Sequence, residues 1–209
     1  MSLVQHPIKL VIAPHADDEA LGCGGILDEN TVVYICGIDE SAFPVERPSL
    51  GTRIAEAREV EKVTGSCYII NTDTKVNYLQ VTAMVESLEC VIHSVQPEYI
   101  YIPHPGYNQD HRIVYQAALT ALRPHDKNFF VNKVLVYEGV HDFIWSANTF
   151  IPNYFTPIDI DRKLDIFSHY KTQLRSYRSL DTIKQIAALR GAMSNVPYAE
   201  AYSIARWVE

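Results

Sequence analysis

Short apolar runs alternate with amphipathic stretches over the first two thirds of the chain, and this alternation predicts the fold. Five runs rich in β-branched and aromatic residues have the length of buried strands, at 9–13, 31–37, 67–71, 98–103 and 133–138. The stretches between them have helical periodicity, most clearly at 52–63, 78–95 and 111–122. Because strands that alternate with helices form right-handed crossovers, the pattern predicts a Rossmann-like three-layer α/β/α sandwich with a mostly parallel sheet.

The two stretches richest in histidine and aspartate follow the first and the fourth predicted strand. Residues 14–19 read PHADDE, and residues 103–111 read PHPGYNQDH. In a doubly wound sheet with strand order 3-2-1-4-5, the first and fourth strands are neighbours, and their carboxyl ends frame the crevice that binds ligands. The topology therefore predicts that these two remote stretches meet at one site.

Metal binding is the chemistry that these residue types favour. His15, Asp18 and His111 would supply two imidazoles and one carboxylate, which is the ligand count of a catalytic zinc site with one open position. The same ligands also suit iron(II), because ligand type alone does not separate the two metals. We favour Zn2+, since nothing else in the sequence indicates redox chemistry. Asp17 is expected to point elsewhere than Asp18 and to remain free to move a proton.

Each of these residues also has an ordinary structural interpretation. His15 alone could be a loop histidine, and Asp18 or Asp110 could cap a helix. The crowding of three carboxylates at 17–19 favours a cation, because like charges in one turn repel each other.

Long connections follow the second and fifth strands, at 38–51 and 139–155, and we expect both to overhang the crevice as walls of a substrate pocket. His141 lies in the second of these loops and could reach the pocket. His104 either lines the pocket or belongs to a rigid turn. Gly-Cys-Gly-Gly at 22–25 lacks the spacing of a phosphate loop, so close helix packing is the better interpretation.

Composition limits the class of protein. A chain of 209 residues with 47% hydrophobic content is long enough for one sizeable core, so we predict a single domain over 1–209. The formal charge of −7 and the scattered basic residues exclude a footprint for nucleic acid, and a small soluble substrate is the expected partner. The sequence contains no apolar run near the ~20 residues of a membrane span and no signal peptide, so we expect a cytoplasmic protein.

The cysteines and aromatic residues give less information about function. The four cysteines are widely spaced and form no C-x-x-C pair, so buried free thiols are expected. The aromatic-rich segments 145–155 and 198–207 could form either core or the interface of a homo-oligomer.

The motifs resemble those of the PIG-L/LmbE-like family of zinc-dependent N-acetylglucosaminyl deacetylases. Residues 14–19 are similar to the family's A/P-H-P/A-D-D-E motif, and 108–111 (NQDH) to its second motif, x-x-D-H. Residues 53–57 (RIAEA) resemble its R-x-x-E-A stretch, and 152–173 resembles its P-N, D-I, K and Q tract. The resemblance spans nearly the whole chain and implies the LmbE-like form of the α/β/α sandwich.

Carried over residue by residue, the resemblance implies that His15, Asp18 and His111 bind zinc and that Asp17 is the general base. The implied substrate is an N-acetyl amino sugar or its conjugate, which loses acetate. Asp110 would orient a neighbouring group. Arg53 could bind a phosphate or hydroxyl of the substrate, or could form an ordinary surface ion pair.

Asn108 departs from the family pattern. Many members have a histidine at this position, where it is thought to assist at the developing oxyanion or to act as an acid. An amide can donate a hydrogen bond but cannot transfer a proton. Either Asp17 performs both proton transfers, or another group such as His104 or His141 takes part. Asn108 and Tyr107 are the candidate donors to the oxyanion.

Two rival functions remain open from the sequence. One is a metal hydrolase that acts on another acyl or phosphoryl bond. The other is a non-catalytic sugar- or nucleotide-binding domain that uses the same crevice. Asp17 weighs against the second, because a pure binding site has no need of a free carboxylate beside a metal.

Overall fold

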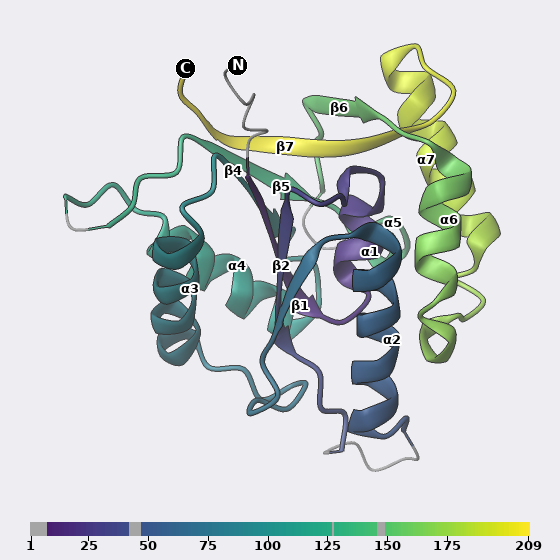
Figure 1. Cartoon of the computed structure of the whole chain (residues 1–209). Helices are drawn as coiled ribbons and strands as arrows, with labels where there is room; N and C mark the ends of the chain where they lie inside the picture. Colours follow the sequence, from purple (N-terminus) through teal and green to yellow (C-terminus); the bar gives the residue numbers. More distant parts are fainter. Residues whose placement is uncertain (1–7, 42–46, 127, 146–148) are drawn as a thin grey trace, which may run out of the picture.

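A seven-stranded β-sheet forms the middle layer of this computed structural model, which describes residues 8–41, 47–126, 128–145 and 149–209 (Figure 1). The strand order is β3-β2-β1-β4-β5-β7-β6. The five parallel strands are β1 (Lys9–His15), β2 (Thr31–Gly37), β3 (Cys67–Ile70), β4 (Tyr99–Pro103) and β5 (Lys133–Tyr137). The predicted order 3-2-1-4-5 is therefore confirmed, and β1 lies beside β4.

The sequence did not predict the last two strands. β7 (Ala199–Trp207) pairs antiparallel with β5 and with β6 (Tyr154–Pro157). Glu200 is only 4% exposed at the start of β7, where a local pattern would require an apolar residue. Lys163, on α6, offsets the cost of burying this carboxylate by forming an ion pair with it. The hydrophobic pattern within β7 cannot reveal a partner that lies on another element.

Helices cover both faces of the sheet, as predicted. One face carries α3 (Val81–Val95) and α4 (Gln109–Ala121), and the other carries α1 (Asp18–Cys23), α2 (Leu50–Thr64), α6 (Ile160–Ser168) and α7 (Leu180–Ser194) (Figure 1). Two 3-10 turns, η1 (Gly24–Ile26) and η2 (Lys171–Gln173), and the short helix α5 (Val140–Ile144) complete the elements.

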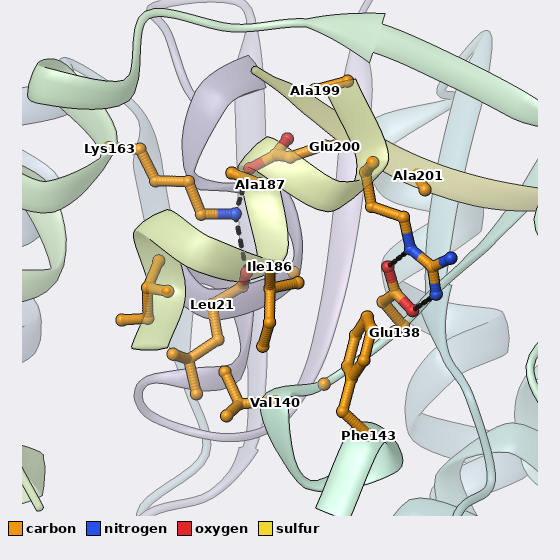
Figure 2. A pocket seen from close by; sticks show the side chains of 14 residues that line it. Leu21, Glu138, Val140, Phe143, Lys163, Ile186, Ala187, Ala199, Glu200 and Ala201 are labelled. Carbon is orange, nitrogen blue, oxygen red and sulfur yellow. Dashed lines mark hydrogen bonds and ion pairs between the residues drawn. The ribbon is translucent and has the colours of Figure 1, made fainter. Parts of the chain in front are cut away.

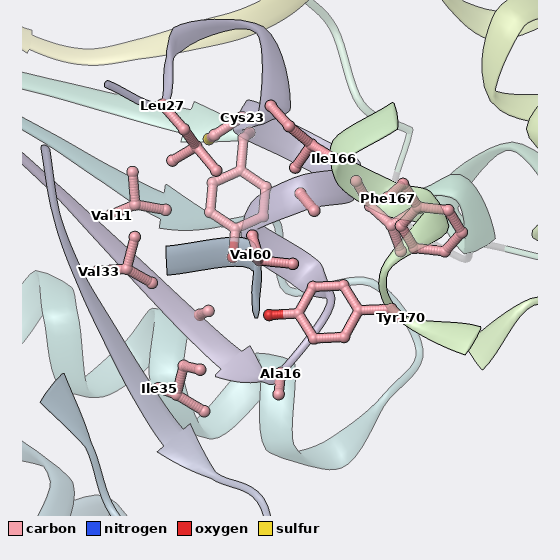
Figure 3. Close-up of a cluster of buried hydrophobic side chains, with 14 of the residues drawn as sticks. Val11, Ala16, Cys23, Leu27, Val33, Ile35, Val60, Ile166, Phe167 and Tyr170 are labelled. Atoms are coloured by element: carbon pink, nitrogen blue, oxygen red, sulfur yellow. The ribbon is translucent and has the colours of Figure 1, made fainter. Parts of the chain in front are cut away.

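Alternate residues of β1 divide the core into two clusters. Leu10 and Ile12 pack with α3 and α4, whereas Val11 and Ala13 belong to the cluster on the opposite face, part of which is drawn in Figure 3. All four side chains have no exposed surface. A strand that is buried on both faces has an uninterrupted apolar sequence, which is why β1 was recognisable.

The glycines at 22–25 allow close packing, as expected. A Cβ atom on Gly22 would lie 2.2 Å from the ring of Tyr137, and one on Gly25 would lie 2.3 Å from the side chain of Ile158.

The two long connections predicted from the sequence are only partly loops in the structure. The connection predicted at 139–155 contains α5, while its residues 146–148, and residues 42–46 of the other connection, lie outside the described residues.

Two buried ion pairs fasten the carboxyl-terminal elements to the sheet (Figure 2). The Nζ atom of Lys163 donates to Glu200 (2.6 Å) and to the carbonyl of Leu21 (2.7 Å). Arg190 donates through two nitrogens to both carboxylate oxygens of Glu138. The space between these groups is about 20 Å³, close to the volume that one water molecule requires. The ion pairs therefore serve packing rather than ligand binding.

Cysteines and surface features complete the picture. All four cysteines are free thiols, and Cys23 and Cys36 are buried as expected, whereas Cys67 and Cys90 are exposed. The two aromatic-rich segments differ from each other in burial, because Tyr202 of the second is fully buried in the core and Trp145 of the first is 73% exposed. Among the helices of the described residues, none combines the length and the apolar character that a membrane crossing requires.

Candidate metal centre

The end of β1 and the start of α1 place the first two predicted ligands. The backbone N–H of His15 donates to Oδ2 of Asp18 at 3.0 Å, which folds the turn back on itself. The same oxygen lies 3.3 Å from Nδ1 of His15. The short turn between strand and helix therefore holds imidazole and carboxylate side by side at the carboxyl edge of the sheet.

The third predicted ligand comes from α4. Asn108 caps this helix, because its side-chain oxygen accepts a hydrogen bond from the backbone N–H of Asp110 at 2.8 Å. The cap directs the first turn of α4 towards β1. Nε2 of His111 then lies 3.1 Å from Oδ2 of Asp18. The predicted meeting of the two stretches is confirmed.

The three side chains fit a divalent cation. One ligand atom from each of His15, Asp18 and His111 can be chosen so that all three lie within 4.8 Å of one another. Burial tends to raise the pKa of Asp18, but His111 and His15 outweigh it and hold this pKa well below its usual range. Burial also tends to lower the pKa of His15, but hydrogen bonds with Asp110 and Asp18 raise it to about 10. Both directions mean that the site favours a positive charge.

Asp110 fixes the orientation of His15 from behind. Its Oδ2 atom lies 2.9 Å from Nε2 of His15 and accepts a hydrogen bond from the backbone N–H of Asn77 at 2.6 Å. Asp110 has no exposed surface. Because Nε2 is engaged in this way, Nδ1 is the nitrogen of His15 that faces Asp18. This arrangement is the carboxylate–histidine support that is common behind metal ligands.

Asp17 has a strained backbone and a buried side chain. Its φ of 140° and ψ of −25° are unusual for a residue other than glycine. The side chain is 2% exposed and forms an ion pair with Arg178. Burial raises the pKa of Asp17, and the charge of Arg178 opposes that shift. Asp17 thus pairs with the cation Arg178, whereas Asp18, the next residue of the same turn, contacts His15 and His111.

Glu19, the last residue of the PHADDE turn, is a support that sequence reasoning did not single out. It has no exposed surface, and the hydroxyls of Tyr68 and Tyr170 donate to it. Its other oxygen accepts the backbone N–H of Asp17 at 3.2 Å. Burial raises the pKa of Glu19 to about 7. This carboxylate holds the strained residue in place from the core side, where Tyr170 is visible in Figure 3.

The loop after β5 brings His141 to the metal centre. The ring of His141 packs edge-on against His111, with centroids 4.6 Å apart, and lies 5.5 Å from the ring of Tyr107. Its Nε2 atom is buried and has no hydrogen-bond partner among the described residues. His104 contacts the residue that follows His141, since its Nδ1 atom is 3.1 Å from Oδ1 of Asp142. Tyr107 is 44% exposed and therefore lies at the rim.

Arg53 forms buried ion pairs rather than a surface one, and its side chain is almost inaccessible to solvent. Its guanidinium donates to Glu56 at 2.6 Å and lies 3.1 Å from Glu40, and the residue is only 2% exposed. It also donates to the carbonyl of Ala16, next to Asp17. Of the two alternatives for Arg53, the surface ion pair was wrong, because the guanidinium is buried between the carboxylates of Glu40 and Glu56. Its part in substrate binding stays a prediction.

A cavity of about 230 Å³ opens beside these residues. Its lining includes His15, Asp17 and Asn108 together with the arginines Arg47, Arg175 and Arg178. His104, Tyr107 and His141 do not belong to this lining. The arginines were not singled out from the sequence, since they lie outside any recognisable motif and reach the cavity only through tertiary folding.

Fold and site together define a class. The chain is a mostly parallel α/β/α sandwich with a His-Asp-His cluster at the carboxyl edge of neighbouring strands β1 and β4. The chain belongs to the PIG-L family, whose model, described as GlcNAc-PI de-N-acetylase, matches residues 10–122. The matched region contains all three predicted ligands together with Asp17 and Asn108.

Individual relatives agree with this placement. A protein of Escherichia coli strain K12, "Uncharacterized deacetylase YaiS", is 26% identical over 181 residues, which are 81% of this chain and 90% of that protein. The structure of GalB, the 4-carboxy-2-hydroxymuconate hydratase of Pseudomonas putida KT2440, superposes with a TM-score of 0.76 at 18% identity and covers 98% of this chain and 99% of that one. The N,N'-diacetylchitobiose deacetylase of Pyrococcus horikoshii gives 0.71 at 19% identity, over 95% and 83%. The two structures establish the LmbE-like fold.

Proposed function

We propose that this protein is a metal-dependent deacetylase that removes the N-acetyl group from an N-acetylglucosamine-type amino sugar or its conjugate. The observation that carries the proposal is the convergence of His15, Asp18 and His111 within 4.8 Å, with the carboxylate of Asp17 beside them. The description of the family and the name of the Escherichia coli relative support the choice of an N-acetyl group.

We propose zinc as the metal, with iron(II) as the alternative. The residues that would hold it are His15, Asp18 and His111, a set of two imidazoles and one carboxylate that leaves room for substrate. A metal in such a site supplies Lewis-acid polarisation of an acyl oxygen and lowers the pKa of water to roughly 7.

Asp17 is proposed as the general base. Its carboxylate lines the cavity beside His15, so it can accept a proton from the attacking water. When the carbon–nitrogen bond of the acetamide breaks, the same carboxyl group can return that proton to the departing amine. The products are acetate and a free amino sugar. Arg178 and the Glu19 side chain hold Asp17 in position for both transfers.

Asn108 and His141 are proposed as hydrogen-bond donors to the charge that develops on the acyl oxygen. The side-chain oxygen of Asn108 is occupied by the cap on α4, so its NH2 group is the part that can serve a ligand. The Nε2 atom of His141 lies near His111, has no hydrogen-bond partner among the described residues and is 3.8 Å from Oδ1 of Asp142. Loss of one such donor typically costs about 2.7–4 kcal/mol of barrier. Tyr107 can assist at the rim, and His104 is tied to Asp142.

The proposal is tested by metal analysis combined with acetate release from a panel of N-acetyl amino sugars and their conjugates. The expected result is one metal ion per chain and acetate release that disappears in Asp17→Asn. Release of another acid or of phosphate would support a different hydrolase, and ligand binding without turnover would support a binding domain.

A second candidate follows from the cavity. Its arginine lining favours an anionic substrate, and the relative GalB is named as a hydratase of a carboxylic acid. A hydration reaction would add water to a carbon–carbon double bond and release no acetate. Loss of ultraviolet absorbance from an unsaturated carboxylic acid, without acetate, would favour this candidate over deacetylation.

The remaining predictions concern the molecule as a whole. A single domain over 1–209 and a cytoplasmic compartment stay predictions, and a homo-oligomer stays one of the two alternatives for the aromatic-rich segments. A small N-acetyl amino sugar or its conjugate is the proposed partner.

A further inference from the structure

A second cavity, of about 380 Å³, lies at the amino-terminal edge of the sheet. Lys9, which begins β1, and Tyr99, which begins β4, line this second cavity. His15, which ends β1, belongs to the metal centre at the opposite edge. β1 has seven residues, so at about 3.3 Å per residue its two ends are about 20 Å apart. The second cavity shares no lining residue with the cavity beside the metal centre, so it is a separate site.

Tyrosines of two strands line the second cavity, namely Tyr99 and Tyr101 on β4 and Tyr154 on β6. The ring of Tyr101 packs edge-on against Tyr202 of β7, with centroids 5.2 Å apart. The rings of Tyr99 and Tyr154 lie 6.1 Å and 5.5 Å from the ring of Trp207, also on β7. Because β7 holds these rings in place, a ligand that packs on them loses little affinity to the ordering of side chains.

Hydroxyl groups at the second cavity lack partners in the protein. Tyr101 is only 5% exposed, and its hydroxyl forms no hydrogen bond with the described residues. A buried tyrosine hydroxyl usually has a partner, so the partner of this one has to come from the contents of the cavity. Burial raises the pKa of Tyr101, so its hydroxyl stays protonated and can both donate and accept. The side-chain hydroxyls of Tyr154 and Thr156, on the same lining, likewise form no hydrogen bond with the described part of the chain.

Arg162 adds a positive charge that no carboxylate compensates. Lys9 and Asp28, on the same lining, neutralise each other, because Nζ of Lys9 lies 2.6 Å from Oδ2 of Asp28. Arg162, near the start of α6, donates to the carbonyl of Leu27 at 2.5 Å and forms no ion pair with the described residues. A guanidinium group has five N–H donors, so Arg162 retains donors for a ligand.

We propose that the second cavity is a non-catalytic binding site for a saccharide. A sugar ring has C–H groups on its faces, which pack on tyrosine rings, and hydroxyl groups around its edge, which both donate and accept hydrogen bonds. The unpartnered hydroxyls of Tyr101, Tyr154 and Thr156 match that edge, and the guanidinium donors match sugar oxygens. A flat heterocycle would use the rings and leave most of these hydroxyls unsatisfied. The inference does not depend on the proposed deacetylase function, since neither the metal ligands nor Asp17 line this cavity.

Trp207 gives a direct reading of the second cavity. The chain has two tryptophans, and the other one, Trp145, is 73% exposed. In a Trp145→Phe protein, Trp207 is the remaining tryptophan, and its ring lies 5.5 Å from that of Tyr154. Its fluorescence is titrated with cellobiose, maltose, lactose and N,N'-diacetylchitobiose, and with adenosine as the flat heterocycle, under excitation that adenosine does not absorb. The expected result is a saturable change for at least one of the four sugars.

Variants of the Trp145→Phe protein then assign the bound sugar to the second cavity. Tyr101→Phe removes one hydroxyl and is expected to raise the dissociation constant of the sugar by about 10-fold. Arg162→Gln, on another element, is expected to weaken binding by about the same factor. Tyr115→Phe is the matched control, because Tyr115 packs with the core cluster on the opposite face of the sheet and does not line the cavity. It should leave the affinity unchanged.

Three results would overturn the inference. They are no saturable response to any of the four sugars, a response to adenosine alone, and a sugar affinity that both Tyr101→Phe and Arg162→Gln leave unchanged. Weaker binding in either variant, with Tyr115→Phe unchanged, would support it. Acetate release depends on the metal centre and should be the same in Tyr101→Phe as in the wild type, so the saccharide site and the deacetylase function stand or fall separately.

Discussion

Arg178 forms an ion pair with Asp17 across 161 residues of sequence. The arginine comes from the turn before α7, and the aspartate comes from the turn between β1 and α1. Asp17 is 2% exposed, so its charge depends on this partner for compensation. The candidate base is therefore held from two sides, by Arg178 at the cavity and by Glu19 in the core.

This ion pair predicts a measurable coupling. Arg178→Gln should lower the free energy of unfolding, because it leaves the Asp17 carboxylate without a counter-charge. Asp17→Asn removes the charge that needs compensation, so the double variant should be more stable than the sum of the single effects implies. Denaturant unfolding of the four proteins should give a coupling free energy of about 0.5–3 kcal/mol. Strict additivity would show that the pair contributes nothing.

Metal content should separate the proposed ligand His111, the proposed base Asp17 and the supporting carboxylate Asp110. His111→Ala is expected to lose the metal, since one of three ligands disappears. Asp17→Asn should retain a stoichiometric amount while turnover falls to background. Asp110→Asn should weaken metal affinity by about 10–100-fold, because Nε2 of His15 loses its carboxylate support. Elemental analysis after dialysis against a weak chelator measures all three. A His111→Ala protein with full metal content would remove that residue from the ligand set.

Two glycine substitutions should have opposite effects on stability. Gly22→Ala places a Cβ atom 2.2 Å from the ring of Tyr137, so the free energy of unfolding should fall by about 1–3 kcal/mol. Gly51→Ala, in α2, meets nothing closer than 3.8 Å and should leave stability unchanged or raise it by up to about 1 kcal/mol. Thermal unfolding monitored by circular dichroism compares the two. Equal melting temperatures for both variants would contradict the packing argument.

The pair of Lys9 and Asp28 should make stability depend on acid pH. Burial tends to raise the pKa of Asp28, but hydrogen bonds from Lys9 and Thr31 outweigh it and lower this pKa below 3.8. A carboxyl group with a depressed pKa stabilises the folded state above its unfolded pKa, and this contribution disappears as pH falls through the folded value.

Asp28→Asn should therefore be less stable than the wild type at pH 7, with a difference that shrinks as the pH is lowered below about 3.8. The side chain of Asp28 is 39% exposed, so the effect should be small and should decrease with added salt. Urea unfolding at several pH values measures it. A difference that persists unchanged at the lowest pH would assign the effect to something other than the charge.

The sequence predicted the parallel half of the sheet and the convergence of His15 with His111. Both depend on patterns that are local, namely apolar runs buried on two faces and a topological rule that makes β1 and β4 neighbours. β7 was not predicted, because its buried Glu200 interrupts the apolar pattern and is stabilised only by Lys163 of helix α6. Arg178 and Arg175 escaped for a related reason. Their turn has no periodicity of its own, and only the packing of α6 and α7 against the sheet brings it to the cavity.

The backbone of Asp17 has one more implication. At φ 140°, glycine would be the residue of least conformational cost, and a glycine there would remove the strain together with the carboxylate. Foldability and chemistry thus make opposite demands on a single position. Asp17→Gly should relieve that strain but leave the Arg178 charge without its partner, so a search for stabilised variants that is blind to activity should reach it only together with Arg178→Gln, and the proposed base would be lost.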